Sequence, residues 1–211
     1  MSKRNPRKAE MRNIVFDLGN IIVDVRYERL AKVMSIPIEE FNTIYQHPNF
    51  RDFETGKMSA NEYFQFLAEN SSFDLSQQAR YQAAIMVTFP LRLRTWGLLH
   101  FLRRRFSLYL LSNTNPVDFE GIDRAYGMRP RFDHCFLSYE QGLMKPDPAI
   151  YQKATELWRI KASQTIFFDD RKENIDAANA FGWKAFHIQH ETQMINELVE
   201  NGCFSALEVS Y

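Results

Sequence analysis

Asp17 is the first residue of this 211-residue chain whose type and position could support chemistry. It ends the apolar run Ile14-Val15-Phe16, and Gly19 and Asn20 follow soon after. A buried parallel strand that delivers one acidic side chain to its C-terminal end has this pattern. Ligands of open α/β sheets bind at that edge, so Asp17 is a candidate nucleophile. Taken alone, the segment fits equally well a carboxylate that caps a turn or a helix.

Two later strand ends and one loop carry the groups that such a nucleophile would require: Ser112 with Asn113, Asp169 with Asp170, and Lys145. A carboxylate that attacks a phosphate ester approaches a dianion, and a divalent cation such as Mg²⁺ with oxygen ligands removes that repulsion. A fixed ammonium group would stabilise the phosphoryl oxygens and keep the nucleophile ionised. Each group alone could be a strand-end turn, a surface lysine or a helix cap. Their occurrence together favours one site.

The elements that must position these groups alternate between strands and helices. Strand patterns cover residues 106–111, 134–138, 164–168 and 183–188. Asn115 and Pro116 are a suitable N-cap and first helical residue, and Gly182 is a suitable C-cap for a helix ending at Phe181. Strands that alternate with helices predict an α/β fold, a Rossmann-like parallel sheet with helices on both faces.

Residues 27–92 contain no convincing strand and are typical of helices joined by short breaks. Helical spacing begins at Tyr27, Pro37 opens a second helix, and Ser59 with Glu62 forms a capping box for a third. A fourth helix is predicted from Asp74 towards Met86. We therefore expect three parts: a flexible tail (1–10), a Rossmann-like catalytic core (11–26 and 93–211), and an all-helical cap domain (27–92).

The composition excludes several classes of protein. The 26 basic and 26 acidic residues give no excess of positive charge, which argues against a nucleic-acid partner. Cys135 and Cys203 match no metal-binding spacing and imply no disulfide framework, as expected in a reducing cytosol. No apolar run approaches the length of a membrane span, and residues 1–10 do not resemble a signal peptide. These features predict a cytoplasmic protein with a small-molecule partner and no membrane association. Nothing in the sequence suggests an obligate assembly, so a monomer is expected.

Four segments resemble, in order, the motifs of the haloacid dehalogenase (HAD) superfamily, whose members are mostly magnesium-dependent phosphatases: VFDLGN, LLSNTN, GLMKPDP and FFDDRKENIDAANAFG. The resemblance covers Met11 to about Val199, and the helical segment resembles the cap of many members. It implies that Asp17 attacks the ester to form an aspartyl-phosphate, which water then hydrolyses. It also implies Mg²⁺ as cofactor and the remaining roles: Asp17, the Gly19 backbone carbonyl and Asp170 as metal ligands, Asp169 as a ligand through water, and Ser112, Asn113 and Lys145 as phosphate-binding groups.

One position departs from the family pattern. Many family phosphatases carry a second aspartate two residues after the nucleophile, as general acid and base, and here that position is Gly19. General acid–base help contributes about two to four orders of magnitude in rate. Three explanations stay open. The leaving group could be good enough without help, as in an anomeric sugar phosphate. Another residue could serve, with Asp24, Glu54 and His47 as candidates beside a water. Or the protein could be a poor catalyst with a binding role.

The resemblance narrows the predicted function without fixing the substrate. The phrase DLGN resembles a bacterial subgroup that includes a sugar-1-phosphate phosphatase, so a phosphatase for small phosphate monoesters, chiefly sugar phosphates, is the leading hypothesis. The polar segment with Arg51, Glu54 and Lys57 resembles a loop by which caps reach the active site. The alternatives are a haloacid dehalogenase, which needs no metal, and a non-catalytic phosphometabolite-binding or regulatory protein. An extra acidic pair beside a carboxylate nucleophile argues against the dehalogenase, since it is costly without a cation.

Overall fold

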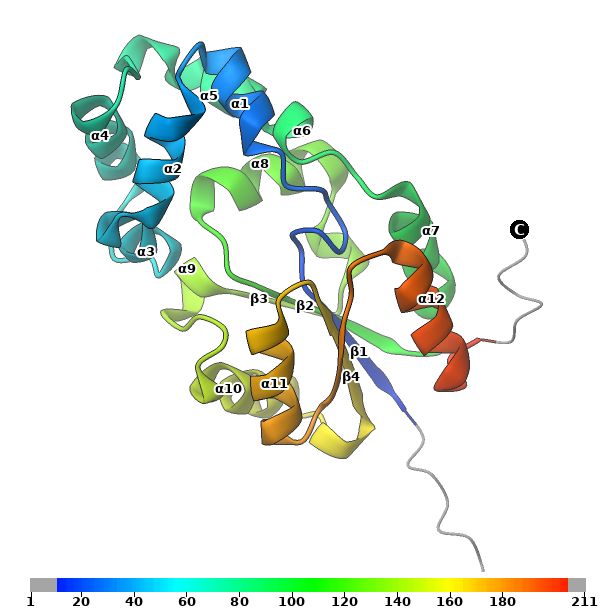
Figure 1. The fold of residues 1–211 in the computed structure, drawn as a ribbon. Helices are drawn as coiled ribbons and strands as arrows, with labels where there is room; N and C mark the ends of the chain where they lie inside the picture. Colours follow the sequence, from blue (N-terminus) through cyan, green and yellow to red (C-terminus); the bar gives the residue numbers. More distant parts are fainter. Residues whose placement is uncertain (1–10, 205–211) are drawn as a thin grey trace, which may run out of the picture.

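A five-stranded parallel sheet forms the centre of the computed structural model, which describes residues 11–204 (Figure 1). The strand order is β3-β2-β1-β4-β5. The strands are β1 (Asn13–Phe16), β2 (Ser107–Ser112), β3 (His134–Leu137), β4 (Thr165–Asp169) and β5 (Lys184–His187). The predicted parallel α/β sheet is therefore confirmed. The tail predicted at residues 1–10 lies outside the described residues.

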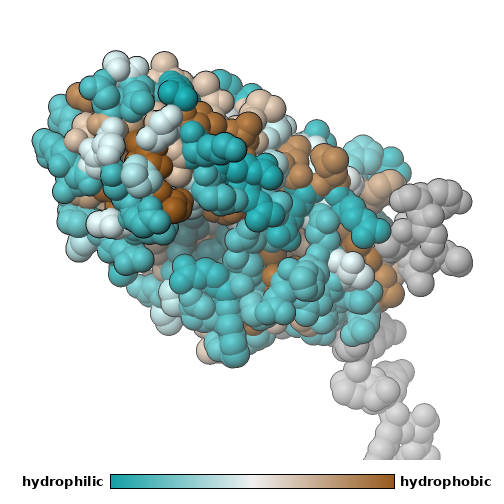
Figure 2. All heavy atoms as spheres, turned by 45° about the horizontal axis from the view of Figure 1, so that its top comes forward, coloured by the Kyte–Doolittle hydropathy of each residue, from teal (hydrophilic) through white to brown (hydrophobic). Residues whose placement is uncertain are grey.

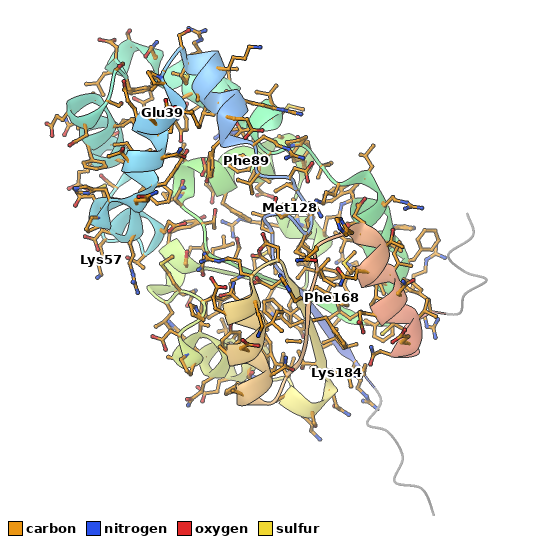
Figure 3. All side chains as sticks on the ribbon, in the orientation of Figure 1. Glu39, Lys57, Phe89, Met128, Phe168 and Lys184 are labelled. Atoms are coloured by element: carbon orange, nitrogen blue, oxygen red, sulfur yellow. The ribbon has the colours of Figure 1, made fainter. Side chains whose placement is uncertain are left out.

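Helices cover both faces of the sheet because side chains alternate along each strand. Phe16 and its same-face neighbours pack with residues of α7 (Leu93–Leu102), α8 (Pro116–Tyr126) and α12 (Glu191–Glu200). Val15 and its neighbours pack with α10 (Pro148–Trp158) and α11 (Lys172–Phe181) on the other face. Figure 3 shows three members of the first cluster, Phe89, Met128 and Phe168, in the interior.

The predicted helix ends of the core have clear local causes. Asn115 accepts a hydrogen bond from the backbone N–H of Asp118 at 2.9 Å, and Pro116 is the first residue of α8. Gly182 ends α11 in the left-handed region with φ at 109°. Both features match the predicted caps. The short helix α9 (Ser138–Gln141) follows β3 directly and was not predicted.

Helices α1 to α6 lie together at one end of the molecule, beyond the carboxyl edge of the sheet (Figure 1). Helices α1 to α5 build a hydrophobic cluster that is rich in aromatic residues and also includes Val117 of α8. Ile85 of α6 packs in the cluster of the core instead. This confirms a helical cap on an α/β core. Their bounds are α1 (Tyr27–Met34), α2 (Ile38–Gln46), α3 (Pro48–Glu54), α4 (Ala60–Asn70), α5 (Gln78–Ala83) and α6 (Ile85–Thr88).

Two expectations for the cap were wrong in detail. The fourth helix, predicted from Asp74 to Met86, is a 3₁₀ turn at Leu75–Gln77 followed by α5 and α6, with a break at Ala84. The segment 51–57, predicted as a polar loop, is helical as far as Glu54. The capping box of Ser59 and Glu62 is present as predicted. The boundaries at residues 27 and 92 stay a prediction.

Two antiparallel linkers join the cap to the core. The N–H of Asp24 donates to the carbonyl of Pro90 at 2.9 Å, and the N–H of Arg26 donates to that of Thr88 at 2.8 Å. The chain therefore enters and leaves the cap at one place.

No helix within residues 11–204 is long and apolar enough to cross a membrane. Hydrophilic side chains cover most of the face shown in Figure 2, where hydrophobic side chains form only small groups.

Candidate active site

Three neighbouring strands deliver the predicted polar residues to one edge of the sheet. Asp17 follows β1, Ser112 is the last residue of β2, and Asp169 is the last residue of β4. β1 pairs with β2 on one side and with β4 on the other. The N–H of Asp17 donates to the carbonyl of Phe168 at 2.9 Å, which continues the β1–β4 pairing beyond the strand. All three side chains are buried.

Lys145 reaches this edge from the loop before α10. Its Nζ lies 2.6 Å from Oδ1 of Asp17 and 2.6 Å from Oδ2 of Asp169, and the residue is only 5% exposed. Asn113 fixes the loop: its Nδ2 donates to the carbonyl of Lys145, and its Oδ1 accepts from the N–H of Lys145, both at 2.9 Å. The side chain of Asn113 thus positions the lysine backbone, a role that the sequence did not indicate.

The three aspartates form a cluster that could hold a cation. Each of Asp17, Asp169 and Asp170 offers one carboxylate oxygen, and these oxygens lie within 4.8 Å of one another. Carboxylate oxygens are the ligands that Mg²⁺ prefers in proteins. Three carboxylates face a single ammonium group here, so the negative charge is only partly balanced. Both the donor type and the charge therefore fit a divalent cation.

Several neighbours that the sequence did not single out orient these aspartates. Asp169 accepts hydrogen bonds from Nδ2 of Asn174 at 2.9 and 3.0 Å and from the N–H of Arg171 at 2.8 Å. Nδ2 of Asn20 donates to Oδ2 of Asp170 at 2.8 Å. Asn20 has a positive φ of 54°, which Asn tolerates better than most residues. The only sequence signal for Asn20 was its position directly after Asp17-Leu18-Gly19.

Burial controls the protonation of this centre. Burial raises the pKa of Asp17 to about 7, against the opposing charge of Lys145. Burial disfavours the ammonium form of Lys145, yet Asp169 and Asp17 together raise the pKa of Lys145 above its ordinary value. A cation next to the three carboxylates would favour the ionised form of Asp17 and lower its pKa. An ionised Asp17 is the form that a nucleophile requires.

A cavity of about 60 Å³ lies beside Gly19, between the core and the cap. Ser112 and Asn113 line it from the core, Tyr27 and Glu54 line it from the cap, and Asp118 of α8 completes it. Glu54 and Asp118 are thus two carboxyl groups next to the position that lacks an acid. Tyr27 donates to Oδ2 of Asp118 at 3.4 Å and joins the cap to α8.

A second cavity, of about 450 Å³, opens between α3 and the loop of Lys145. His47, Arg51 and Glu54 line it from the cap, and Asn113, Lys145 and Arg171 line it from the core. Of the three cap residues predicted to reach the site, Arg51 and Glu54 therefore do so. Lys57 lines neither of these cavities; its exposed side chain lies 3.6 Å from Asp52 at the edge of the cap (Figure 3).

The three candidate proton donors differ in their surroundings. Asp24 is held by Arg92 at 2.7 Å and Arg26 at 3.1 Å; these contacts outweigh burial and lower its pKa, which makes it a poor acid. His47 is exposed, and its Nδ1 accepts from the N–H of Asn49 at the start of α3. Glu54 is the only one of these candidates that lines the cavity beside Gly19.

Comparisons with known proteins found a matching family model and several relatives. The family model for haloacid dehalogenase-like hydrolases matches residues 11–182. A D-ribitol-5-phosphate phosphatase of Bacteroides thetaiotaomicron is 28% identical, over 89% of this chain and 97% of the relative. A sesquiterpene phosphatase of Aspergillus oryzae is 25% identical, over 87% of this chain and 93% of the relative.

Solved structures share the fold, and one of them is of particular interest. It is a HAD family enzyme of Bacteroides thetaiotaomicron, described as a complex with magnesium and inorganic phosphate. The TM-score is 0.76 at 24% identity, with 86% of this chain and 96% of that chain covered.

Proposed function

Because this chain belongs to the haloacid dehalogenase-like hydrolases, we propose that it is a magnesium-dependent phosphatase that hydrolyses small phosphate monoesters of sugars or polyols. The observation that carries the proposal is the contact of Lys145 with both Asp17 and Asp169 within the acidic cluster. That arrangement combines a nucleophile, a fixed positive charge and a set of cation ligands at one sheet edge. The two phosphatase relatives support the same reaction class.

Each residue of the site has a distinct role in the two steps of the proposed reaction. Asp17 attacks the phosphorus, the bond from phosphorus to the ester oxygen breaks, and an aspartyl-phosphate results. Lys145 stabilises charge on the phosphoryl oxygens and orients Asp17. Ser112 and the backbone N–H of Asn113 donate to other phosphoryl oxygens. Water then attacks the phosphorus of the acyl phosphate, which releases phosphate and restores the Asp17 carboxylate.

The cation ligands would be carboxylate oxygens of Asp17 and Asp170 and the backbone carbonyl of Gly19, with Asp169 acting through a water. When bound, Mg²⁺ would neutralise charge between the nucleophile and the phosphate. The hydrogen bonds to Asp169 and Asp170 support this role, because ligating carboxylates are commonly fixed by outer contacts of this kind.

The two cavities above the site support this substrate class. Polar groups such as Glu54, Asn115 and Asp118 line the small cavity, and Arg51 and Arg171 line the larger one. Hydroxyl groups of a sugar or polyol would find hydrogen-bond partners there. Apolar side chains, among them Leu18, Val25 and Phe89, also line the small cavity. The choice of a polar substrate therefore rests on these polar groups together with the relative that is a D-ribitol-5-phosphate phosphatase. We also propose that the enzyme acts as a cytoplasmic monomer, in keeping with its two unpaired cysteines.

A panel of substrates with and without Mg²⁺ tests the proposal. Ribitol 5-phosphate, glucose 1-phosphate, p-nitrophenyl phosphate and 2-chloropropionate would be incubated with the full chain. We expect phosphate release that depends on Mg²⁺. Asp17→Asn should reduce turnover by roughly a thousandfold or more, since a residue that forms the covalent intermediate has no substitute.

The same panel distinguishes the alternatives. Halide release without metal would identify a haloacid dehalogenase. Binding of phosphate esters without turnover, measured by calorimetry, would identify a non-catalytic binding protein. Either result would overturn the proposed phosphatase.

A further inference from the structure

The site lacks a proton donor at Gly19, yet the half-buried Glu54 and the buried Asp118 line the cavity beside this position. Gly19 has no side chain to give a proton. Glu54 and Asp118 line the same cavity of about 60 Å³ as Gly19. Both residues therefore belong to the wall of the cavity that adjoins Gly19 and the phosphate-binding residues Ser112 and Asn113.

We propose that Glu54 of the cap is the catalytic acid–base residue, and that Asp118 is a positioning residue that acts on Glu54. The inference rests on the proposed phosphatase function and deepens it. The nucleophile would come from the core and the proton from the cap, so a complete site requires both parts of the molecule.

The position of Glu54 supports this role. It is the last residue of α3 and lines both cavities, so its carboxyl stands between the site and the wider opening. The residue before it, Phe53, is fully buried and stacks on Tyr63 with ring centroids 4.2 Å apart. Gly56, two residues after Glu54, lies directly against the backbone carbonyl of Tyr139 in α9. The end of α3 is therefore fixed on both sides.

Burial, more than the surrounding charges, brings the pKa of Glu54 close to neutral pH. Burial and the nearby carboxyl of Asp118 raise the pKa of Glu54 to about 7, while Arg171 and Arg51 act in the opposite direction. Tyr27 and Tyr63 are further titratable groups near Glu54, and Tyr27 binds Asp118. Tyr45, His47, Lys145 and Asp147 line the larger cavity together with Glu54. A carboxyl that titrates near 7 can give a proton and take one back within a catalytic cycle.

The proton balance of the two steps is simple. When Asp17 attacks the phosphorus and the ester bond breaks, the Glu54 carboxyl gives its proton to the leaving alkoxide oxygen. The alcohol departs neutral and Glu54 becomes a carboxylate. Glu54 then takes a proton from the water that attacks the aspartyl-phosphate. The bond from phosphorus to Asp17 breaks, and Glu54 ends the cycle protonated.

The leaving group decides how much this proton matters. A polyol alkoxide is a poor leaving group and needs protonation, whereas p-nitrophenolate departs without it. For Glu54→Gln we expect kcat/KM to fall by about 10²- to 10⁴-fold on ribitol 5-phosphate, and by less than about tenfold on p-nitrophenyl phosphate. Asp52→Asn is the matched control, because Asp52 lies on the same helix with a half-exposed side chain. Its activity on both substrates should stay unchanged.

The pH profile gives a second readout that a purely structural role would not move. Asp118→Asn removes a negative charge near Glu54 and should lower its pKa. The alkaline limb of kcat/KM on ribitol 5-phosphate should then shift to lower pH, and Glu54→Gln should abolish that limb. If Glu54→Gln failed to fold, the shift of the alkaline limb in Asp118→Asn would still test the role of Glu54.

Two results would overturn the inference: equal losses of Glu54→Gln on both substrates, or an alkaline limb that Asp118→Asn leaves in place. Failure of the phosphatase function itself would look different, because the wild-type protein would then release no phosphate from either ester with Mg²⁺.

Discussion

Lys145 shows how one residue can serve both stability and chemistry. It is buried between two carboxylates, and within residues 11–204 no other ammonium or guanidinium group forms an ion pair with either of them. A buried ion pair adds little net stability, but removal of one partner leaves uncompensated charge in the interior. We therefore expect the lysine to stabilise the fold of the site as well as to serve the proposed reaction.

Substitution Lys145→Met tests this double role. We expect a loss of about 3–5 kcal/mol in the free energy of unfolding, since Asp17 and Asp169 lose their shared partner. Turnover should fall as for a catalytic residue. Urea denaturation at pH 7 measures the first effect. The control is Lys172→Met, an exposed lysine paired with Asp176, which should change stability by less than about 0.5 kcal/mol. Equal stability of the two variants would contradict the expectation.

Gly19 offers a second test at this scale. An aspartate there would place an acid on the strand side of the cavity. A Cβ at position 19 would lie 3.1 Å from Cγ2 of Val25, so the substitution is best combined with Val25→Ala. In the Glu54→Gln background we expect Gly19→Asp with Val25→Ala to raise kcat/KM on ribitol 5-phosphate by at least about tenfold. Val25→Ala alone in that background is the control. An equal gain on p-nitrophenyl phosphate would speak against a restored proton donor.

The sequence was most informative where a residue's position in an element decides its role. Asp17, Ser112 and Asp169 could be found because each ends an apolar strand, and parallel strands bring their ends to one edge. Asn174 and Asp118 could not be found in this way. Their contacts depend on how α11 and α8 lie against the sheet, which no spacing records.

At the scale of elements, helix α3 is the one that matters most and the one that the sequence obscured. Its start carries a usable signal, since His47 caps it and Pro48 is its first residue. The polar residues that follow favoured a loop instead. The predicted helix from Asp74 failed for another reason: its backbone breaks at Ala84, where tertiary packing of α5 and α6 against α8 overrides local preference.

The contact between α3 and α9 predicts a sensitive glycine. Gly56 has a φ of 73°, and a Cβ there would lie 2.1 Å from the carbonyl oxygen of Tyr139. Gly56→Ala should therefore displace the end of α3 and Glu54 with it. We expect kcat on ribitol 5-phosphate to fall at least about tenfold, with a smaller change on p-nitrophenyl phosphate.

Gly127→Ala is the matched control for backbone strain. Gly127 has a similar φ of 65°, but a Cβ there would meet nothing within 4 Å. Both variants share the cost of a left-handed alanine, about 1 kcal/mol, which thermal unfolding would measure. Only Gly56→Ala should lose activity. A similar loss in Gly127→Ala would assign the effect to strain alone.

At the scale of the whole molecule, a largely desolvated acid such as Glu54 should lower stability. The pKa of Glu54 rises from its ordinary value of 4.5 to about 7 on folding. Between these values the folded chain binds more protons than the unfolded chain, so stability falls as pH rises through this window. Above pH 7 the loss is complete and amounts to about 3 kcal/mol.

Glu54→Gln removes this cost because its amide does not ionise. We expect the variant to match the wild type in stability near pH 4 and to exceed it by up to about 3 kcal/mol at pH 8. Urea denaturation across this range measures the difference. A constant difference at all pH values would mean that Glu54 titrates alike in both states. Higher stability with lower activity is the trade-off expected of a functional residue.

The architecture as a whole was the most predictable level. The alternating strand and helix patterns predicted a parallel sheet, and the absence of strand patterns in residues 27–92 predicted the helical cap. What the pattern could not supply was the docking of the cap on the core. That docking depends on contacts between residues far apart in the chain, such as Tyr27 with Asp118 and Gly56 with Tyr139.

The paired linkers have a consequence for how such an enzyme can change. The N–H of Asp24 donates a hydrogen bond to the carbonyl of Pro90. The segment of more than sixty residues between them therefore begins and ends at the same place in the structure. From the side of the sheet, the whole cap is equivalent to a single surface turn. Insertions at such a place disturb the parent fold little. If the proton donor resides in the cap, exchange of that one segment would replace both the alcohol that is recognised and the acid that releases it.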